Sequence, residues 1–98
     1  MRKRLEATIF GRVQGVLYRD FARREAGKLG IVGTVENVPK GEVRVVADGE
    51  EEKLHEFLAA LKKGPAFAQV ANVVVRWSDA AGEYSDFRIV YHGLLDRL

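Results

Sequence analysis

Two kinds of apolar spacing succeed one another along this chain, and their order limits the folds that it can adopt. Segments that alternate or are rich in strand-forming residues predict strands over residues 5–12, 31–37, 42–47, 70–77 and 87–91. Apolar residues at helical spacing run from Phe21 to Leu29 and from Leu54 to Leu61. The sequence therefore predicts the order strand, helix, strand, strand, helix, strand, followed by one short extra strand.

This order suits an α+β fold of the ferredoxin-like type. Such a βαββαβ sandwich has an antiparallel sheet with both helices on one face, here with a short extra C-terminal strand. The 98 residues suffice for one small domain and not for a two-domain cleft. We expect this domain to span residues 1–91 and residues 92–98, which show little pattern, to form a loosely docked tail.

Local signals predict where the elements begin and end. Gly30 ends the first helix, and a basic pair followed by glycine and proline ends the second (Lys62, Lys63, Gly64, Pro65). Asp48 or Gly49 is expected to cap the second helix. Pro39 and Gly41 predict a hairpin turn between the second and third strands.

The stretch Gly11–Arg19 connects the first strand to the first helix and predicts an anion site. The first backbone N–H groups of a helix lack internal partners and, with the helix dipole, favour a phosphate or carboxylate. Gly11 and Gly15 would let the backbone approach such a ligand, and Arg19 would add a planar fork for two of its oxygens. The alternative is a tight connection whose arginines are merely solvated, since neither a Walker A loop nor G-x-G-x-x-G is present.

Asn37 is the second polar candidate, because the predicted topology returns the chain to the same edge. A helix of about twelve residues spans about 18 Å, and seven residues of strand climb back about 23 Å. The right-handed crossover makes the first two strands parallel, so Asn37 ends near the level of Gly15. The alternative is a plain turn asparagine before Val38 and Pro39.

Charge is unevenly distributed although the net charge is only +2. Residues 1–28 carry a basic excess (Arg2, Lys3, Arg4, Arg12, Arg19, Arg23, Arg24, Lys28 against Glu6, Asp20, Glu25). Residues 36–56 are mainly acidic. A polyanion needs a continuous basic face, so this distribution favours a small anionic ligand. Nucleic-acid binding on the sheet would need exposed aromatic residues, and the strand 42–47 has none.

Other features limit the compartment and the chemistry. The chain has no cysteine, which excludes disulfides, thiolate metal sites and cysteine nucleophiles. No apolar run is long enough to span a membrane, and a strand pattern, not an apolar signal core, follows Met1–Arg4. We expect a cytoplasmic monomer without a membrane or nucleic-acid partner.

Three motifs of the sequence resemble those of a known family. The motif Gly11–Arg19, the later Gly33–Asn37 and the pair Lys40-Gly41 closely resemble the acylphosphatase family over about residues 5–91. The resemblance implies a ferredoxin-like fold and hydrolysis of the carboxyl-phosphate bond of small acyl phosphates to a carboxylate and inorganic phosphate, without metal or cofactor. It implies that Arg19 binds the phosphate and that Asn37 orients the attacking water. The loop backbone of Gln14, Gly15, Val16, Leu17 and Tyr18 would cradle the phosphoryl group, and phosphate or sulfate would bind as product-like ligands.

Three positions depart from the commonest family pattern. Tyr18 replaces a phenylalanine, Thr34 stands where tryptophan is frequent, and Glu36 stands where a basic residue is frequent. We expect the last two to affect substrate preference and local charge, but not the fold or the reaction class.

Direct attack by water is chemically reasonable for this bond. The loop holds no serine, cysteine or histidine, so a covalent phosphoenzyme would have to form on Asp20, whose plainer role is that of a first-turn aspartate. The leaving carboxylate has a conjugate acid with a pKa of about 4 and departs without a general acid. A non-catalytic module that binds a small anion in the same loop is the alternative, because this fold hosts many such domains.

Overall fold

The structure is a computed structural model that describes residues 1–97. Its elements are β1 (Arg2–Arg12), α1 (Tyr18–Lys28), β2 (Val32–Asn37), β3 (Val43–Glu50), α2 (Glu51–Lys63), β4 (Gln69–Asp79), β5 (Phe87–Val90) and a short 3-10 helix, η1 (Leu95–Arg97). Apart from η1, which lies in the predicted tail, this is the predicted order. Leu98, the last residue of the predicted tail, lies outside the described residues.

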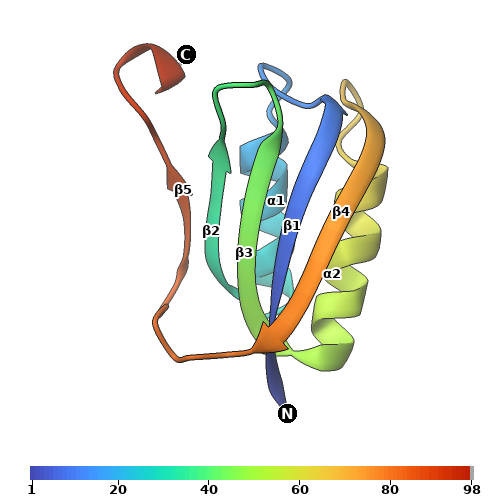
Figure 1. Ribbon diagram of the computed structural model, residues 1–98, viewed down its shortest axis with the longest axis vertical. Helices are drawn as coiled ribbons and strands as arrows, with labels where there is room; N and C mark the ends of the chain where they lie inside the picture. Colours follow the sequence, from blue (N-terminus) through green and yellow to red (C-terminus); the bar gives the residue numbers. More distant parts are fainter. Residues whose placement is uncertain (98) are drawn as a thin grey trace.

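The strands form one sheet in the order β4-β1-β3-β2-β5, and both helices cover the same face (Figure 1). β1 pairs antiparallel with β3 and β4, and β2 pairs antiparallel with β3. The short strand β5 pairs parallel with β2, so the complete sheet is mixed. β3 lies between the parallel strands β1 and β2, as the right-handed crossover predicts.

β1 and β3 extend beyond their predicted bounds, and opposite charges face each other in the added part. β1 begins at Arg2, and its charged start lies opposite the acidic end of β3, where Arg4 faces Asp48. Nε and Nη2 of Arg4 donate to the two carboxylate oxygens of Asp48 at 2.8 and 3.0 Å. Asp48, which is 1% exposed, therefore lies within β3 and does not cap α2. The N-cap of α2 is Glu50, without a side-chain capping bond.

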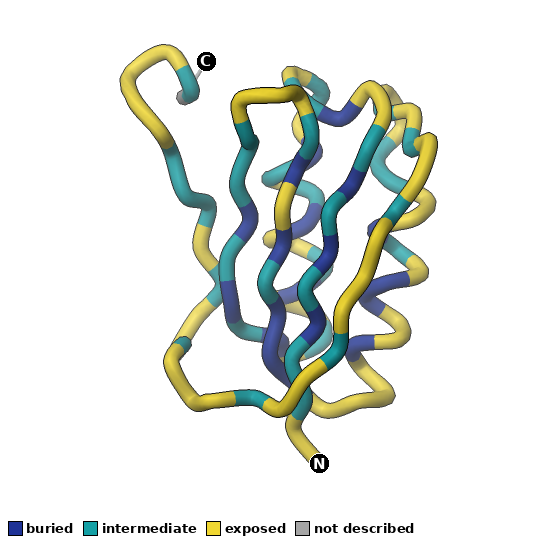
Figure 2. Tube along the Cα trace, in the orientation of Figure 1, coloured by how far each residue is buried: buried dark blue, intermediate teal, exposed yellow. Residues whose placement is uncertain are grey.

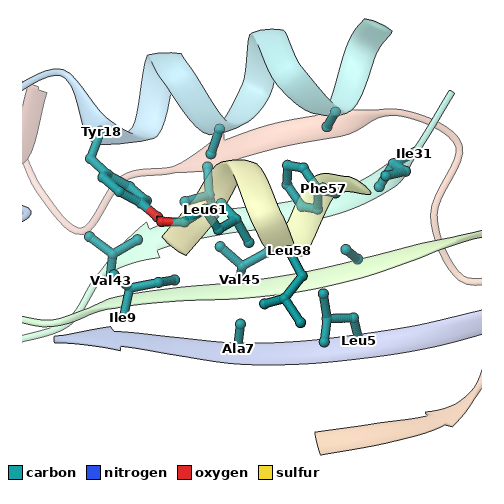
Figure 3. Close-up of a cluster of buried hydrophobic side chains, with 14 of the residues drawn as sticks. Leu5, Ala7, Ile9, Tyr18, Ile31, Val43, Val45, Phe57, Leu58 and Leu61 are labelled. Atoms are coloured by element: carbon teal, nitrogen blue, oxygen red, sulfur yellow. The ribbon is translucent and has the colours of Figure 1, made fainter. Parts of the chain in front are cut away.

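The core lies between the sheet and the two helices. Figure 2 shows buried positions along the central strands and on the inner sides of both helices. Figure 3 shows Tyr18 of α1 reaching across to Leu61 of α2, close to Ile9 and Val43 of the sheet. The core residues are Leu5, Ala7, Ile9, Val13, Tyr18, Ala22, Ala26, Ile31, Val35, Val43, Val45, Ala47, Leu54, Phe57, Leu58 and Leu61. No helix within residues 1–97 has the length and apolarity required to cross a bilayer.

Gly11 has a different role from the predicted one. It lies at an irregularity in the pairing of β1 with β4, between Phe10 and Gly11, with φ at 129°. A Cβ atom at this position would come 2.1 Å from the carbonyl oxygen of Gln69. The close approach that requires glycine here is therefore to the neighbouring strand and not to a ligand.

Candidate active site

The loop between β1 and α1 has an unusual backbone. Gly15 and Leu17 both adopt left-handed conformations, with φ at 72° and 64°. For leucine this conformation costs about 1–2 kcal/mol, so the surroundings must hold it. Val13 is buried at 1% exposure, and the carbonyl of Leu17 accepts a hydrogen bond from the N–H of Phe21 at 3.1 Å. The loop conformation is thus anchored at both ends.

The side chains of the loop are directed mainly to the protein. Nε2 of Gln14 donates to the carbonyl oxygens of Val38 and Glu42, at 2.8 and 2.9 Å, and so ties the loop to the turn between β2 and β3. Val16 packs against the core. Within residues 1–97, the backbone N–H groups of Gly15, Val16 and Leu17 donate to no other residue. These N–H groups are therefore donors without a protein partner in the described part of the chain.

Tyr18 begins α1 and is 1% exposed. Its hydroxyl donates to the carbonyl oxygen of Leu61 at 2.6 Å, so its side chain faces away from solvent. Burial raises the pKa of this phenol. The Tyr18 hydroxyl therefore links the two helices and is not a titratable group at the surface.

Arg19 follows in the first turn of α1, and Asn37 ends β2. Nη1 of Arg19 lies 3.0 Å from Oδ1 of Asp96, and Nδ2 of Asn37 lies 3.4 Å from the same oxygen. Arg19 and Asn37 thus both contact one carboxylate oxygen. Their side chains are therefore close enough together for a single small oxyanion to contact both. Oδ1 of Asn37 is buried without a hydrogen-bond partner among the described residues.

These residues line a cleft of about 460 Å³, a size suited to a small molecule. Gln14, Gly15, Leu17 and Tyr18 of the predicted loop contribute to it, but Val16 does not. The remaining lining residues are Val13, Arg19, Asp20, Asn37, Ile89, Tyr91, Leu95 and Asp96. Arg12 lies outside this lining, and its Nη2 is 3.5 Å from the carbonyl oxygen of Phe67.

Tyr91 and Asp96 are polar residues of the site that the sequence does not signal. The guanidinium of Arg19 lies 5.0 Å from the centre of the Tyr91 ring, a cation–π contact that helps to hold it. Asp96 lies in the segment expected to form a loosely docked tail, yet its carboxylate accepts hydrogen bonds from the N–H of His92 and from Arg19, and these two partners lower the pKa of Asp96. No local pattern signals Asp96, since it is 77 residues away from Arg19.

Fold and site together define a class: a small ferredoxin-like sandwich with a polar cleft between a helix N-terminus and the end of a neighbouring strand. The family profile of the acylphosphatases matches residues 5–89. The chain therefore belongs to the acylphosphatase family.

Individual relatives agree with this assignment. An acylphosphatase of Thermus thermophilus is 52% identical over 79 residues, which cover 81% of this chain and 90% of the relative. One from Dehalococcoides mccartyi is 46% identical over 88 residues, 89% of this chain and 97% of the relative. The crystal structure of acylphosphatase from Bacillus subtilis superposes with a TM-score of 0.88 at 36% identity, covering 91% of this chain and 99% of that one.

The chain is thus an enzyme that hydrolyses acyl phosphates, which are small-molecule substrates. The alternative of a non-catalytic anion-binding module is not favoured by these similarities.

Proposed function

We propose that Arg19 and the backbone of residues 14–18 hold the phosphoryl group, and that Asn37 orients the water that attacks it. The main observation in support is that Arg19 and Asn37 both contact a single carboxylate oxygen, Oδ1 of Asp96. An anion at this point meets a guanidinium, a side-chain amide and the start of a helix. Groups fixed in this way stabilise developing charge better than water does, because they need no reorganisation.

The phosphoryl group is the part of the substrate that fits the loop. Its oxygens can accept hydrogen bonds from the guanidinium of Arg19 and from the N–H groups of Gly15, Val16 and Leu17. The positive end of the α1 dipole favours the same anion. The left-handed conformations of Gly15 and Leu17 support this role, because successive N–H groups in such a backbone form an anion-binding concavity.

Asn37 fits the role of a water-positioning group. A buried amide oxygen without a partner costs free energy, and a bound water that donates to Oδ1 of Asn37 would remove that cost. An amide cannot act as a base at neutral pH, so the proton of the water passes to a phosphoryl oxygen or to solvent. The carboxylate then leaves unassisted, because its conjugate acid has a pKa of about 4.

Hydrolysis of benzoyl phosphate in ¹⁸O-labelled water tests the bond that breaks. Attack of water on phosphorus places the label in inorganic phosphate, whereas attack on the carbonyl carbon would place it in benzoate and contradict the proposal. Asp20→Asn is the matched variant, because Asp20 lines the cleft and could form a covalent intermediate. Direct attack predicts that this variant keeps its turnover. A loss comparable to removal of a nucleophile would favour the phosphoenzyme.

Further expectations remain part of the proposal. Inorganic phosphate and sulfate should compete with the acyl phosphate substrate. Residues 1–91 should form the catalytic domain, with residues 92–98 as an appendage. The protein should act as a cytoplasmic monomer without a nucleic-acid partner. Isothermal titration with phosphate and sedimentation analysis test the binding and the oligomeric state.

A further inference from the structure

The segment 92–97 follows β5 and turns back over the end of the sheet that carries the cleft. Figure 1 shows this segment beyond β5, at the same end as the loop before α1 and the turn between β2 and β3. It ends in the 3-10 helix η1, and Leu95 and Asp96 line the cleft. The segment lies outside the part matched by the family profile, which ends at residue 89.

Asp96 makes the contacts expected of a bound anion. Nη1 of Arg19 donates to Oδ1 of Asp96 at 3.0 Å, and Nη2 donates to the backbone carbonyl oxygen of Asp96 at 2.7 Å. Asn37 donates to the same Oδ1 at 3.4 Å. The side chains of Arg19 and Asp96 are only 15% and 17% exposed, so water screens this pair weakly.

Two contacts hold the segment in the shape that presents this carboxylate. The backbone N–H of His92 donates to Oδ2 of Asp96 at 2.8 Å, which closes a small loop within the segment. Nε2 of His92 lies 2.5 Å from the carboxylate of Glu36 on β2. Glu36 thus anchors the segment next to Asn37.

We propose that the segment 92–97 is an intramolecular inhibitor of the anion site, with Asp96 bound where the phosphoryl group of the substrate binds. The proposal rests on the roles given above to Arg19 and Asn37. Both anions need the guanidinium of Arg19, so Asp96 must leave before a phosphoryl group can bind.

The energetic balance allows this exchange. A phosphate carries more charge and more acceptor oxygens than one carboxylate, so it can also engage the loop N–H groups. The tethered carboxylate compensates through its high effective concentration. Because substrate binds only the open form, the apparent dissociation constant is raised by the reciprocal of the open fraction, while the chemical step in the open form is unchanged.

The test compares the full-length protein with Asp96→Asn, which keeps the shape of the side chain and removes its charge. We expect the dissociation constant of inorganic phosphate and the KM for benzoyl phosphate both to fall by about fivefold, with kcat unchanged. Asp86→Asn is the control, because it removes the same charge from an exposed side chain that pairs with Arg88 and lies outside the cleft. This control should change neither constant by more than about twofold.

Amide NMR reports the displacement directly. Saturating phosphate should move the backbone amide signals of residues 94–96 of the wild type toward the positions that they have in Asp96→Asn without phosphate, because both conditions weaken the docking of the segment on Arg19. Unchanged or weaker phosphate binding in Asp96→Asn would overturn the proposal and make Asp96 a positioning residue for Arg19. Tighter phosphate binding without benzoyl phosphate hydrolysis in any variant would instead retain the inhibitor and refute the proposed catalytic roles.

Discussion

The hydroxyl of Tyr18 donates a hydrogen bond of 2.6 Å to the carbonyl oxygen of Leu61, which joins the first turn of α1 to the last turn of α2. The same first turn carries Arg19. The position of the guanidinium thus depends on a contact made inside the core.

Tyr18→Phe should lower the free energy of unfolding by about 1 kcal/mol, because it leaves the carbonyl of Leu61 unpaired. Urea denaturation should show a lower midpoint with an unchanged slope. Turnover should be retained, since the ring still fills its place. An unchanged midpoint would show that the hydrogen bond contributes no net stability.

The stability difference between wild type and Tyr18→Phe should also depend on pH. Burial raises the pKa of Tyr18 in the folded state above its unfolded value of about 10. The folded state therefore favours the protonated phenol, whose contribution is complete below about pH 10 and is lost as the pH rises toward the folded pKa. The wild type should lose its advantage over the variant in this range. Parallel stability curves at high pH would contradict this assignment.

Arg19→Lys should weaken phosphate binding by about tenfold or more, because an ammonium cannot donate two parallel hydrogen bonds from a planar fork. It would also lose much of the contact with the Tyr91 ring. Isothermal titration with phosphate measures the effect. Arg12→Lys is the control with the same chemical change outside the cleft, and equal losses in both variants would point to general charge instead of a specific fork.

Asn37→Ala should reduce kcat for benzoyl phosphate by roughly 100-fold, while phosphate binding changes by less than about threefold. The reason is that Asn37 acts on the water, whereas Arg19 and the loop hold the phosphoryl group. Steady-state kinetics and phosphate titration separate the two effects. Asn72→Ala on the exposed strand β4 is the matched control, and retained turnover in Asn37→Ala would remove Asn37 from the mechanism.

Arg4→Ala should destabilise the protein by about 3 kcal/mol, because it leaves the buried carboxylate of Asp48 without its bidentate partner. Lys3→Ala removes a neighbouring cation whose partner, Asp79, is 85% exposed, and should cost less than about 1 kcal/mol. Thermal and urea denaturation check both values. Similar losses for the two variants would mean that burial of Asp48 does not set the cost.

Gly11→Ala and Gly27→Ala should have opposite effects on stability. A Cβ at Gly11 would meet the carbonyl oxygen of Gln69 at 2.1 Å and should cost about 2 kcal/mol or more. A Cβ at Gly27, within α1, meets nothing within 4 Å and should stabilise the helix by about 0.5–1 kcal/mol. The two unfolding midpoints test this contrast directly. A stable Gly11→Ala variant would show that β1 and β4 can separate there.

Local features of the sequence were sufficient for the element order and for the position of the loop before α1. Alternation and helical spacing report which face of a segment is buried, and breakers report where a segment ends. The proximity of Asn37 to Gly15 followed from segment lengths and crossover handedness, and both residues line the cleft.

Tertiary structure alone decided the role of Gly11, the burial of Asp48 and the place of Asp96. Gly11 and Asp48 depend on which residue of a neighbouring strand lies opposite, and strand register is a long-range property. Asp96 occupies the cleft because β5 pairs parallel with β2, which carries the end of the chain back to Arg19 and Asn37. A segment without periodicity, docked by a few polar contacts to distant residues, leaves no local pattern from which its position could be inferred.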